Sequence, residues 1–343
     1  MSFSTNVPFS TKILPLSLES YFNQHQISDF LPVYLVLSDN ALTLNEKQSK
    51  KVTVDSTNQE LVVFSDLSMT NLLALQNISH ISINALTTIN TRNQQTSYRF
   101  SITCTDFIKS RKSIADFALA QGIEAALIQD APTLTEPGLL VMDMDSTTIE
   151  IECIDEIAKL AGVGEQVAAV TELAMLGELD FAQSLHQRVA TLANAPEQIL
   201  ADVAKNIPLM AGLENLISEL KKHNWRIAVA SGGFTYFADH LKELLALDAT
   251  FANTLDIVDG KLTGKVLGSV VDAQVKADSL ILLAKQYQIP ASQTVAMGDG
   301  ANDLIMMAAA GFGVAFHAKP IVLAQADSSI NKQGLDCLLH WLA

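Results

Sequence analysis

The sequence is poor in cysteine and has no long apolar runs. Its three cysteines, Cys104, Cys153 and Cys337, lie far apart and lack the CxxC or Cys/His spacing of zinc ligands. A disulfide framework is therefore not expected, and a reducing cytoplasm is the predicted compartment. No segment reaches the roughly 18 consecutive apolar residues of a membrane span. The first residues also lack the basic and apolar regions of an export signal.

Positive charge is also scarce. The chain has 22 Lys and Arg against 37 Asp and Glu, a formal net charge of −15. Residues 1–138 contribute 9 − 12 = −3 and residues 139–343 contribute 13 − 25 = −12. A nucleic-acid partner and an anionic membrane partner are not expected for such a chain. The acidic excess suits metal ligands as well as an ordinary soluble surface, so charge alone does not decide between them.

The length of 343 residues predicts about two domains. The first part is rich in Ser, Thr, Asn and Gln, with short β-favouring runs and two helical segments, and it predicts a small α+β domain over residues 1–135. The expected strands cover 32–37, 61–64 and 98–102, and the expected helices cover 69–75 and 110–120. No group of catalytic residues is apparent there.

From residue 136 to 343 the pattern is that of an α/β domain. Continuous apolar runs at 139–142, 226–230 and 294–297 are typical of strands buried on both faces of a parallel sheet, and amphipathic helices precede the last two. This predicts a doubly wound, Rossmann-like parallel sheet. Residues 149–208 are helical in pattern and too long for an ordinary crossover, so they predict an inserted helical cap. Asp259-Gly260 predicts a β-hairpin turn.

Two acidic segments follow predicted strands. The segment DMDST at 143–147 follows the first strand, and GDGAND at 298–303 follows the third. In such sheets ligands bind beyond the carboxyl ends of the strands, so these carboxylates are expected to meet. Carboxylates among glycines suit Mg²⁺. Each segment alone could equally be a helix-capping turn.

Two further segments suit a phosphate group. The segment SGG at 231–233 offers a hydroxyl and closely approaching backbone N–H groups, although by itself it could be a tight turn. Lys276 could supply a fixed positive charge to a phosphoryl oxygen, although a solvated surface lysine is the more usual case.

In this order the four segments resemble the motifs of the haloacid dehalogenase-type phosphohydrolases, over about residues 138–340. Within that family they are most similar to the phosphoserine phosphatases, as are residues 150–152 (EIE) and Phe234. The resemblance implies a Mg²⁺-dependent hydrolase that converts O-phospho-L-serine, a small-molecule substrate, to L-serine and phosphate through an aspartyl-phosphate. This reaction is the last step of serine biosynthesis.

The resemblance also implies roles for particular residues. Asp143 would be the nucleophile and Asp145 the general acid and base. Mg²⁺ would be held by the Asp143 carboxylate, the Asp145 backbone carbonyl and Asp299, with Asp303 close by. The residues that would grip or position the phosphoryl group are Ser231, Gly232, Lys276 and Asn302.

The cap would recognise the amino-acid part of the substrate. Glu152 can pair with an ammonium group and Arg188 can bind a carboxylate with two hydrogen bonds. Met175 and Phe181 match the family's pocket-lining residues. Without the resemblance, Met175 and Phe181 would be expected in a core, and Arg188 in a surface ion pair.

Other functions stay open at this stage. The same chemistry could serve a phosphatase or phosphotransferase for a different small phosphorylated metabolite. A signalling receiver, in which a phosphorylated aspartate is the output, is disfavoured by Asp145 and by the large cap. For residues 1–135, longer bacterial relatives suggest an ACT-like module with a regulatory or dimerisation role, so a homodimer is one expected assembly.

Overall fold

The structure is a computed structural model that describes residues 4–45, 59–64 and 66–343. It has two compact units, one formed by the chain up to Ala131 together with Asp327–Ala343, the other by Pro132–Ala326. This division differs from the predicted one, 1–135 and 136–343, because the C-terminal segment belongs to the first unit.

The first unit contains an antiparallel sheet with the strand order β1-β3-β2-β5-β6-β4-β7. Its strands are β1 (Ser4–Pro8), β2 (Val33–Leu37), β3 (Ala41–Asn45), β4 (Gln59–Phe64), β5 (Ile81–Arg92), β6 (Gln95–Cys104) and β7 (Ala125–Gln129). Its helices are α1 (Leu18–Gln24), α2 (Met69–Ser79) and α3 (Phe107–Gln121), and the C-terminal segment adds β14 (Ser328–Ile330) and α13 (Leu338–Trp341). The three strands and two helices expected from the sequence of this part are confirmed.

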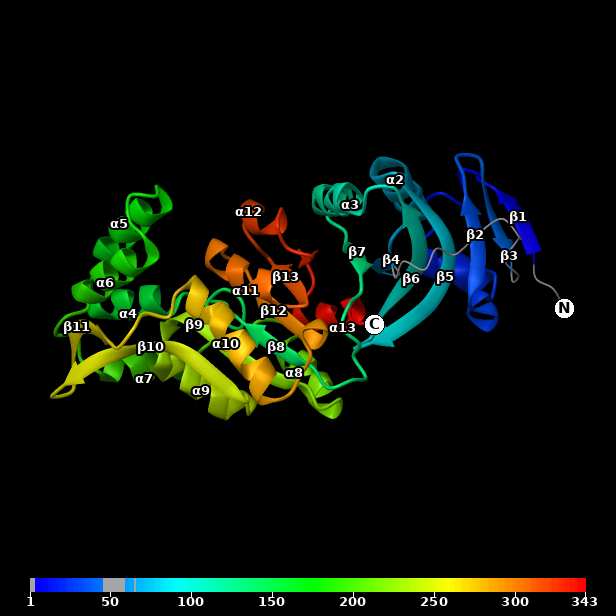
Figure 1. The fold of residues 1–343 in the computed structure, drawn as a ribbon. Coiled ribbons are helices and arrows are strands. Elements are labelled where there is room, and N and C mark those ends of the chain that lie inside the picture. Colours follow the sequence, from blue (N-terminus) through cyan, green and yellow to red (C-terminus); the bar gives the residue numbers. More distant parts are fainter. Residues whose placement is uncertain (1–3, 46–58, 65) are drawn as a thin grey trace. The chain divides into compact units, whose positions relative to one another are not determined.

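Residues 59–129 of this unit form a β-α-β-β-α-β unit. The chain runs β4, α2, β5, β6, α3, β7, and these strands lie in the order β5-β6-β4-β7. This is the ferredoxin-like arrangement. In Figure 1 the long β5–β6 hairpin lies on one side of this arrangement, whose inner strands are β6 and β4. Burial alternates at the start of β5, and apolar side chains of both strands, such as Ile83 and Phe100, lie in the core under the helices.

A buried arginine binds the C-terminal segment into the first unit. Arg99 is 4% exposed, pairs with Glu60 and donates from Nη2 to the backbone carbonyls of His340 (3.1 Å), Trp341 (3.2 Å) and Leu342 (2.7 Å). Carbonyls at the end of a helix lack partners within the helix, so the guanidinium satisfies them. Arg99 and these three carbonyls are 241 to 243 residues apart in sequence, which is why no local pattern predicted the contact.

The second unit contains the predicted parallel sheet. Its strands are β8 (Leu139–Met142), β9 (Arg226–Phe234), β10 (Ala249–Val258), β11 (Lys261–Leu267), β12 (Thr294–Gly298) and β13 (Phe312–Phe316), in the order β11-β10-β9-β8-β12-β13. Only β11 is antiparallel to its neighbour. The helices around the sheet are α8 (Leu213–Lys222), α9 (Thr235–Leu245), α10 (Ala273–Gln286), α11 (Leu304–Ala309) and α12 (Pro320–Leu323). The doubly wound α/β fold is confirmed.

The predicted cap region, residues 149–208, contains four helices. They are α4 (Cys153–Ala161), α5 (Gly164–Met175), α6 (Phe181–Thr191) and α7 (Gln198–Ala204), gathered at one end of the parallel sheet (Figure 1). The Asp259-Gly260 hairpin is confirmed as the turn between β10 and β11. Its β11 strand also supports the cap, because Leu262 exchanges backbone hydrogen bonds with Asn194 and Ala195.

Across the described ranges, no helix has the length and apolar character needed to cross a membrane.

We predict that Arg99→Met destabilises the protein by about 3 kcal/mol, because it leaves Glu60 and three carbonyls without their cation. The free energy of unfolding in urea measures this. Lys112→Ala is the control, since the Lys112–Asp116 pair is more than 60% exposed and should contribute less than about 1 kcal/mol. Equal effects of the two substitutions would show that Arg99 does not hold the C-terminal segment.

Candidate active site

Asp143 follows β8, at the carboxyl end of the central strand. Its Oδ1 accepts hydrogen bonds from the backbone N–H of Met144 (2.7 Å) and from Lys276 Nζ (2.9 Å), and the residue is 5% exposed. No partner of Asp143 Oδ2 occurs among the described residues. The carboxylate is thus fixed through one oxygen, while the other is available to a ligand.

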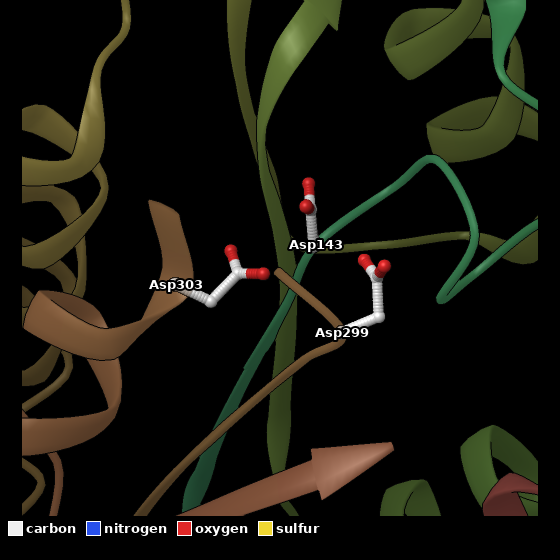
Figure 2. Close-up of side chains that lie close together, drawn as sticks. All are labelled: Asp143, Asp299 and Asp303. Carbon is white, nitrogen blue, oxygen red and sulfur yellow. The ribbon is translucent and has the colours of Figure 1, made fainter. Parts of the chain in front are cut away.

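Asp299 and Asp303 come from the loop after β12. Figure 2 shows their carboxylates beside that of Asp143, and one oxygen of each of the three lies within 4.8 Å of the others. Asp303 is fully buried; its Oδ1 accepts from Lys276 Nζ (2.8 Å) and its Oδ2 from Gly300 N–H (3.0 Å). Since both oxygens are occupied, Asp303 orients the lysine and the loop. Asp143 and Asp299 keep oxygens open to the cavity.

This acidic group fits a magnesium ion. Mg²⁺ prefers hard oxygen ligands such as carboxylates and backbone carbonyls. Burial and the charge of Asp143 raise the pKa of Asp299, and the same two causes raise the pKa of Asp303 to about 7. Carboxylates that resist ionisation because they repel one another are stabilised by a divalent cation. The structure therefore supports the predicted Mg²⁺ site at this loop.

We predict that Mg²⁺ raises the melting temperature more at about pH 8 than at about pH 5.5. The raised pKa values mean that folded Asp299 and Asp303 keep protons that the unfolded chain has released. Without metal, stability therefore falls as pH rises above the unfolded pKa of about 4. Metal binding needs the ionised carboxylates and offsets this loss. Calorimetry with and without Mg²⁺ measures the shift.

Asp299→Ala is the control for this measurement, and it should remove most of the Mg²⁺ effect at both pH values. If Mg²⁺ raises the melting temperature of this variant as much as that of the wild type, the ion binds elsewhere. A larger rise in the wild type at the lower pH would contradict the idea that protons compete with Mg²⁺ for these carboxylates.

Asp145 lies on the loop after β8, two residues beyond Asp143. Its Oδ1 accepts a hydrogen bond from the backbone N–H of Cys153 (3.2 Å) at the start of α4. Burial, followed by the negative charge of Glu152, raises the pKa of Asp145 to about 8. The carboxyl thus carries a proton near neutral pH, which is the state a general acid needs.

Glu152 is held by a serine that the sequence did not single out. Ser146 Oγ donates to Glu152 Oε1 (2.8 Å), and burial raises the pKa of Glu152. Ser146 has a φ of 56°, in the left-handed region that few side chains other than Asn and Asp adopt. That turn brings residues 146 and 152 together, and its backbone conformation could not be read from the spacing.

The last part of strand β9, residues 231–233, lies so close to its neighbours that Gly232 and Gly233 leave no room for a side chain. A Cβ on Gly232 would lie 2.5 Å from Phe181 Cζ of the cap, and one on Gly233 would lie 2.8 Å from Asp145 Oδ2. The backbone of Gly232 therefore lies close to Phe181 of the cap, and the backbone of Gly233 lies close to the Asp145 carboxyl group. The Gly233 N–H donates to Ser231 Oγ (2.8 Å), which orients the hydroxyl.

A cavity of about 200 Å³ joins these groups. It is lined by the predicted residues Asp143, Asp145, Glu152, Phe181, Arg188, Ser231, Gly232, Asp299 and Asn302, and by Ile154, Leu185, Gly233, Phe234, Gly300 and Lys319, which were not predicted as site residues. Lys276 is 1% exposed and lies behind the cavity, bound to Asp143. Lys319 also lines the cavity, although it lies outside the four motifs, just before α12. Only the fold reveals this position.

Arg188 is the cation on the cap side of this cavity. Its Nε is buried and has no hydrogen-bond partner in the described part of the chain. Burial lowers the pKa of Arg188, an effect opposed by the charges of Glu152 and Asp155. A buried donor without a partner is costly, so the guanidinium is suited to an anionic ligand group.

Met175 does not lie where the family pattern placed it. It is 81% exposed and is absent from the cavity lining. It is the last residue of α5, where it lines a groove with Asp155 and Lys159 of α4. Helix α5 buries only Val167, so its C-terminal end is not drawn toward the cavity.

We predict that Gly232→Ala lowers kcat/KM about 10-fold or more, because the added methyl group would overlap the Phe181 ring. Steady-state kinetics measures the loss, and Phe181→Ala in the same chain should restore part of it. Gly164→Ala is the control, since its new methyl group would meet nothing closer than 3.9 Å. A fully active Gly232→Ala variant would contradict the close contact.

Comparison with known proteins gives a consistent result. The family model described as haloacid dehalogenase-like hydrolase matches residues 138–311. A phosphoserine phosphatase of Vibrio cholerae is 62% identical over 213 residues, which are 62% of this chain and 65% of that protein. The match thus spans slightly less than two thirds of that relative.

Two solved structures extend the comparison. The crystal structure of a probable phosphoserine phosphatase from Vibrio cholerae, in its unliganded form, has a TM-score of 0.72 and 47% identity, covering 86% of this chain and 88% of that chain. A structure of a phospho-aspartyl intermediate analogue of phosphoserine phosphatase has a TM-score of 0.58 and 43% identity, covering 61% of this chain and all of that one.

Proposed function

The chain belongs to the haloacid dehalogenase-like hydrolase family, and from this premise we propose that it is a phosphoserine phosphatase, which hydrolyses O-phospho-L-serine to L-serine and phosphate. The observation that carries the proposal is one cavity that joins an aspartate pair suited to phosphoryl transfer with the Glu152 and Arg188 side chains. The reaction would complete serine biosynthesis.

In the first step Asp143 attacks phosphorus. The bond from an Asp143 oxygen to phosphorus forms while the bond from phosphorus to the serine oxygen breaks. Asp145 gives its proton to the departing serine oxygen, which its raised pKa permits near neutral pH. Lys276 Nζ, 2.9 Å from Asp143 Oδ1, holds this carboxylate at the edge of the cavity.

In the second step water attacks the phosphorus of the aspartyl-phosphate. Asp145, now ionised, takes a proton from the water, and the bond between phosphorus and Asp143 breaks to release phosphate. Splitting the displacement in two lets one carboxyl act as acid and then as base. This dual role explains why Asp145 lies under the cap. Burial there raises its pKa to about 8, so that its protonated and ionised states are close in energy near neutral pH.

The residues that would hold Mg²⁺ are Asp143, Asp299 and the Asp145 backbone carbonyl, with Asp303 fixing their surroundings. When bound, the ion supplies positive charge that offsets the repulsion between the Asp143 carboxylate and the phosphate dianion. Lys276, Ser231, Gly232 and Asn302 are assigned to the phosphoryl oxygens.

The serine part of the substrate contacts the cap. Glu152, oriented by Ser146, pairs with the ammonium group. Arg188, whose buried Nε has no hydrogen-bond partner among the described residues, binds the carboxylate. Phe181 closes the cavity over Gly232 and excludes water. The two charged contacts select an α-amino acid over a sugar phosphate or a simple alkyl phosphate.

The phosphate released from L-phosphoserine, phosphothreonine, phosphoethanolamine and a sugar phosphate tests the proposal. We expect Mg²⁺-dependent release that strongly favours phosphoserine, loss of activity in EDTA, and loss by about 10³-fold or more in Asp143→Asn. Arg188→Lys should raise KM for phosphoserine without changing the phosphoethanolamine rate. No release from any substrate would contradict the proposal, and preference for another substrate would overturn the assigned roles of Glu152 and Arg188.

The proposal extends to the setting of the enzyme. The three cysteines are free thiols, which suits a reducing cytoplasm. We propose that the ferredoxin-like residues 59–129 form the core of a regulatory or dimerising module of the ACT-like kind, supported by their strand order. Removing residues 1–131 would also strip the C-terminal segment of Arg99, so point substitutions in the full chain test this role better.

A further inference from the structure

Asn253 is a buried amide in β10 that links two backbone segments of the second unit. It is 2% exposed; its Nδ2 donates to the Gly232 carbonyl (2.8 Å) and its Oδ1 accepts from the Val271 N–H (2.8 Å). It lies beside Phe234, where the register between β9 and β10 shifts. Asn253 does not line the catalytic cavity, so any effect on the reaction passes through its partners.

The first partner is the peptide between Gly232 and Gly233. Its carbonyl accepts from Asn253 and its N–H donates to Ser231 Oγ (2.8 Å), so the peptide is held at both ends. A peptide between two glycines has more rotational freedom than any other. Without the Asn253 contact, the N–H that orients Ser231 would lose its fixed direction.

This orientation decides what the serine hydroxyl can do. A hydroxyl has one hydrogen to donate and two lone pairs that accept. Because Ser231 Oγ already accepts from the Gly233 N–H, its own hydrogen is free to point into the cavity that Ser231 lines. A donor aimed at a phosphoryl oxygen stabilises the charge that develops during transfer.

The second partner leads to Lys276. Val271 lies just before α10, which Asp272 caps, and Lys276 is in the first turns of that helix. The Asn253 amide therefore links the two glycines at the end of β9 to the segment that carries the buried lysine. Ser231 and Lys276, which would both bind phosphoryl oxygens, therefore depend on the Asn253 side chain for their relative placement.

We propose that Asn253 is a positioning residue for the phosphoryl group, acting through the Gly232–Gly233 peptide on Ser231 and through Val271 on the start of α10. The proposal rests on the proposed phosphoserine phosphatase activity. It assigns Asn253 no contact with the serine part of the substrate.

The test compares Asn253→Ala with Gln293→Ala in the full-length protein. Gln293 is a matched control, because it is 6% exposed and its amide also bridges backbone groups, accepting from Thr133 N–H (2.7 Å) and donating to Thr133 O (3.1 Å). It does not line the cavity. For each variant we would measure kcat and KM for phosphoserine, and the inhibition constants of inorganic phosphate and L-serine.

We expect Asn253→Ala to lower kcat/KM by about 10- to 100-fold, mostly in kcat, which corresponds to a weakened hydrogen bond to a charged group. The inhibition constant of phosphate should rise, while that of L-serine stays unchanged. Gln293→Ala should leave all four constants near those of the wild type. Inhibition constants do not depend on the folded fraction, so simple destabilisation would not imitate this pattern.

Other outcomes overturn the proposal. Unchanged constants in Asn253→Ala would do so, and so would an equal rise of both inhibition constants, which indicates general distortion. If Asn253→Ala does not fold, the smaller change Asn253→Ser is measured instead, and failure of both to fold makes Asn253 a structural residue. An inactive wild type refutes the proposed function itself and is thereby distinguished from these results.

Discussion

The active site depends on one buried ammonium group. Lys276 Nζ lies 2.9 Å from Asp143 Oδ1 and 2.8 Å from Asp303 Oδ1, with only 1% of the residue exposed. Burial by itself lowers the pKa of Lys276, but the two carboxylates outweigh it and raise the pKa. A lysine so placed keeps its charge and holds strand β8, the loop after β12 and helix α10 together at one point.

The rest of the site follows from that charge balance. Burial, followed by the charge of Asp143, raises the pKa values of Asp299 and Asp303. The three carboxylates near Lys276 leave a net negative charge, which accounts for the fit to a divalent cation. Asp145 differs from them, since within the described ranges it forms no ion pair and burial raises its pKa to about 8. Different surroundings thus separate the proposed nucleophile, Asp143, from the proposed general acid, Asp145, although only Met144 lies between them.

The central strands of the sheet and the polar residues that follow them could be predicted from the sequence for a physical reason, whereas the cap residues Phe181 and Arg188 were expected from the family resemblance. Buried parallel strands appear as short apolar runs, and their carboxyl ends must share one edge, so polar residues after each run converge. Ser146 and Asn253 could not be found this way, because their contacts depend on a left-handed turn and on a register shift. Met175 was expected in the cavity from the family resemblance, but it is 81% exposed because α5 buries only Val167. Arg99 donates a hydrogen bond to the Leu342 carbonyl, 243 residues away in sequence, so no local pattern could predict the contact.

The central claim is that phosphate passes through Asp143, and the most direct test is to stop the reaction with phosphoserine in acid within one turnover and to locate the phosphoryl group by peptide mass spectrometry. The account predicts one phosphoryl group on the peptide that contains Asp143, formed and lost at the rate of turnover, and none in Asp143→Asn. Phosphate release without that labelled peptide, or a label that persists without release, would contradict it.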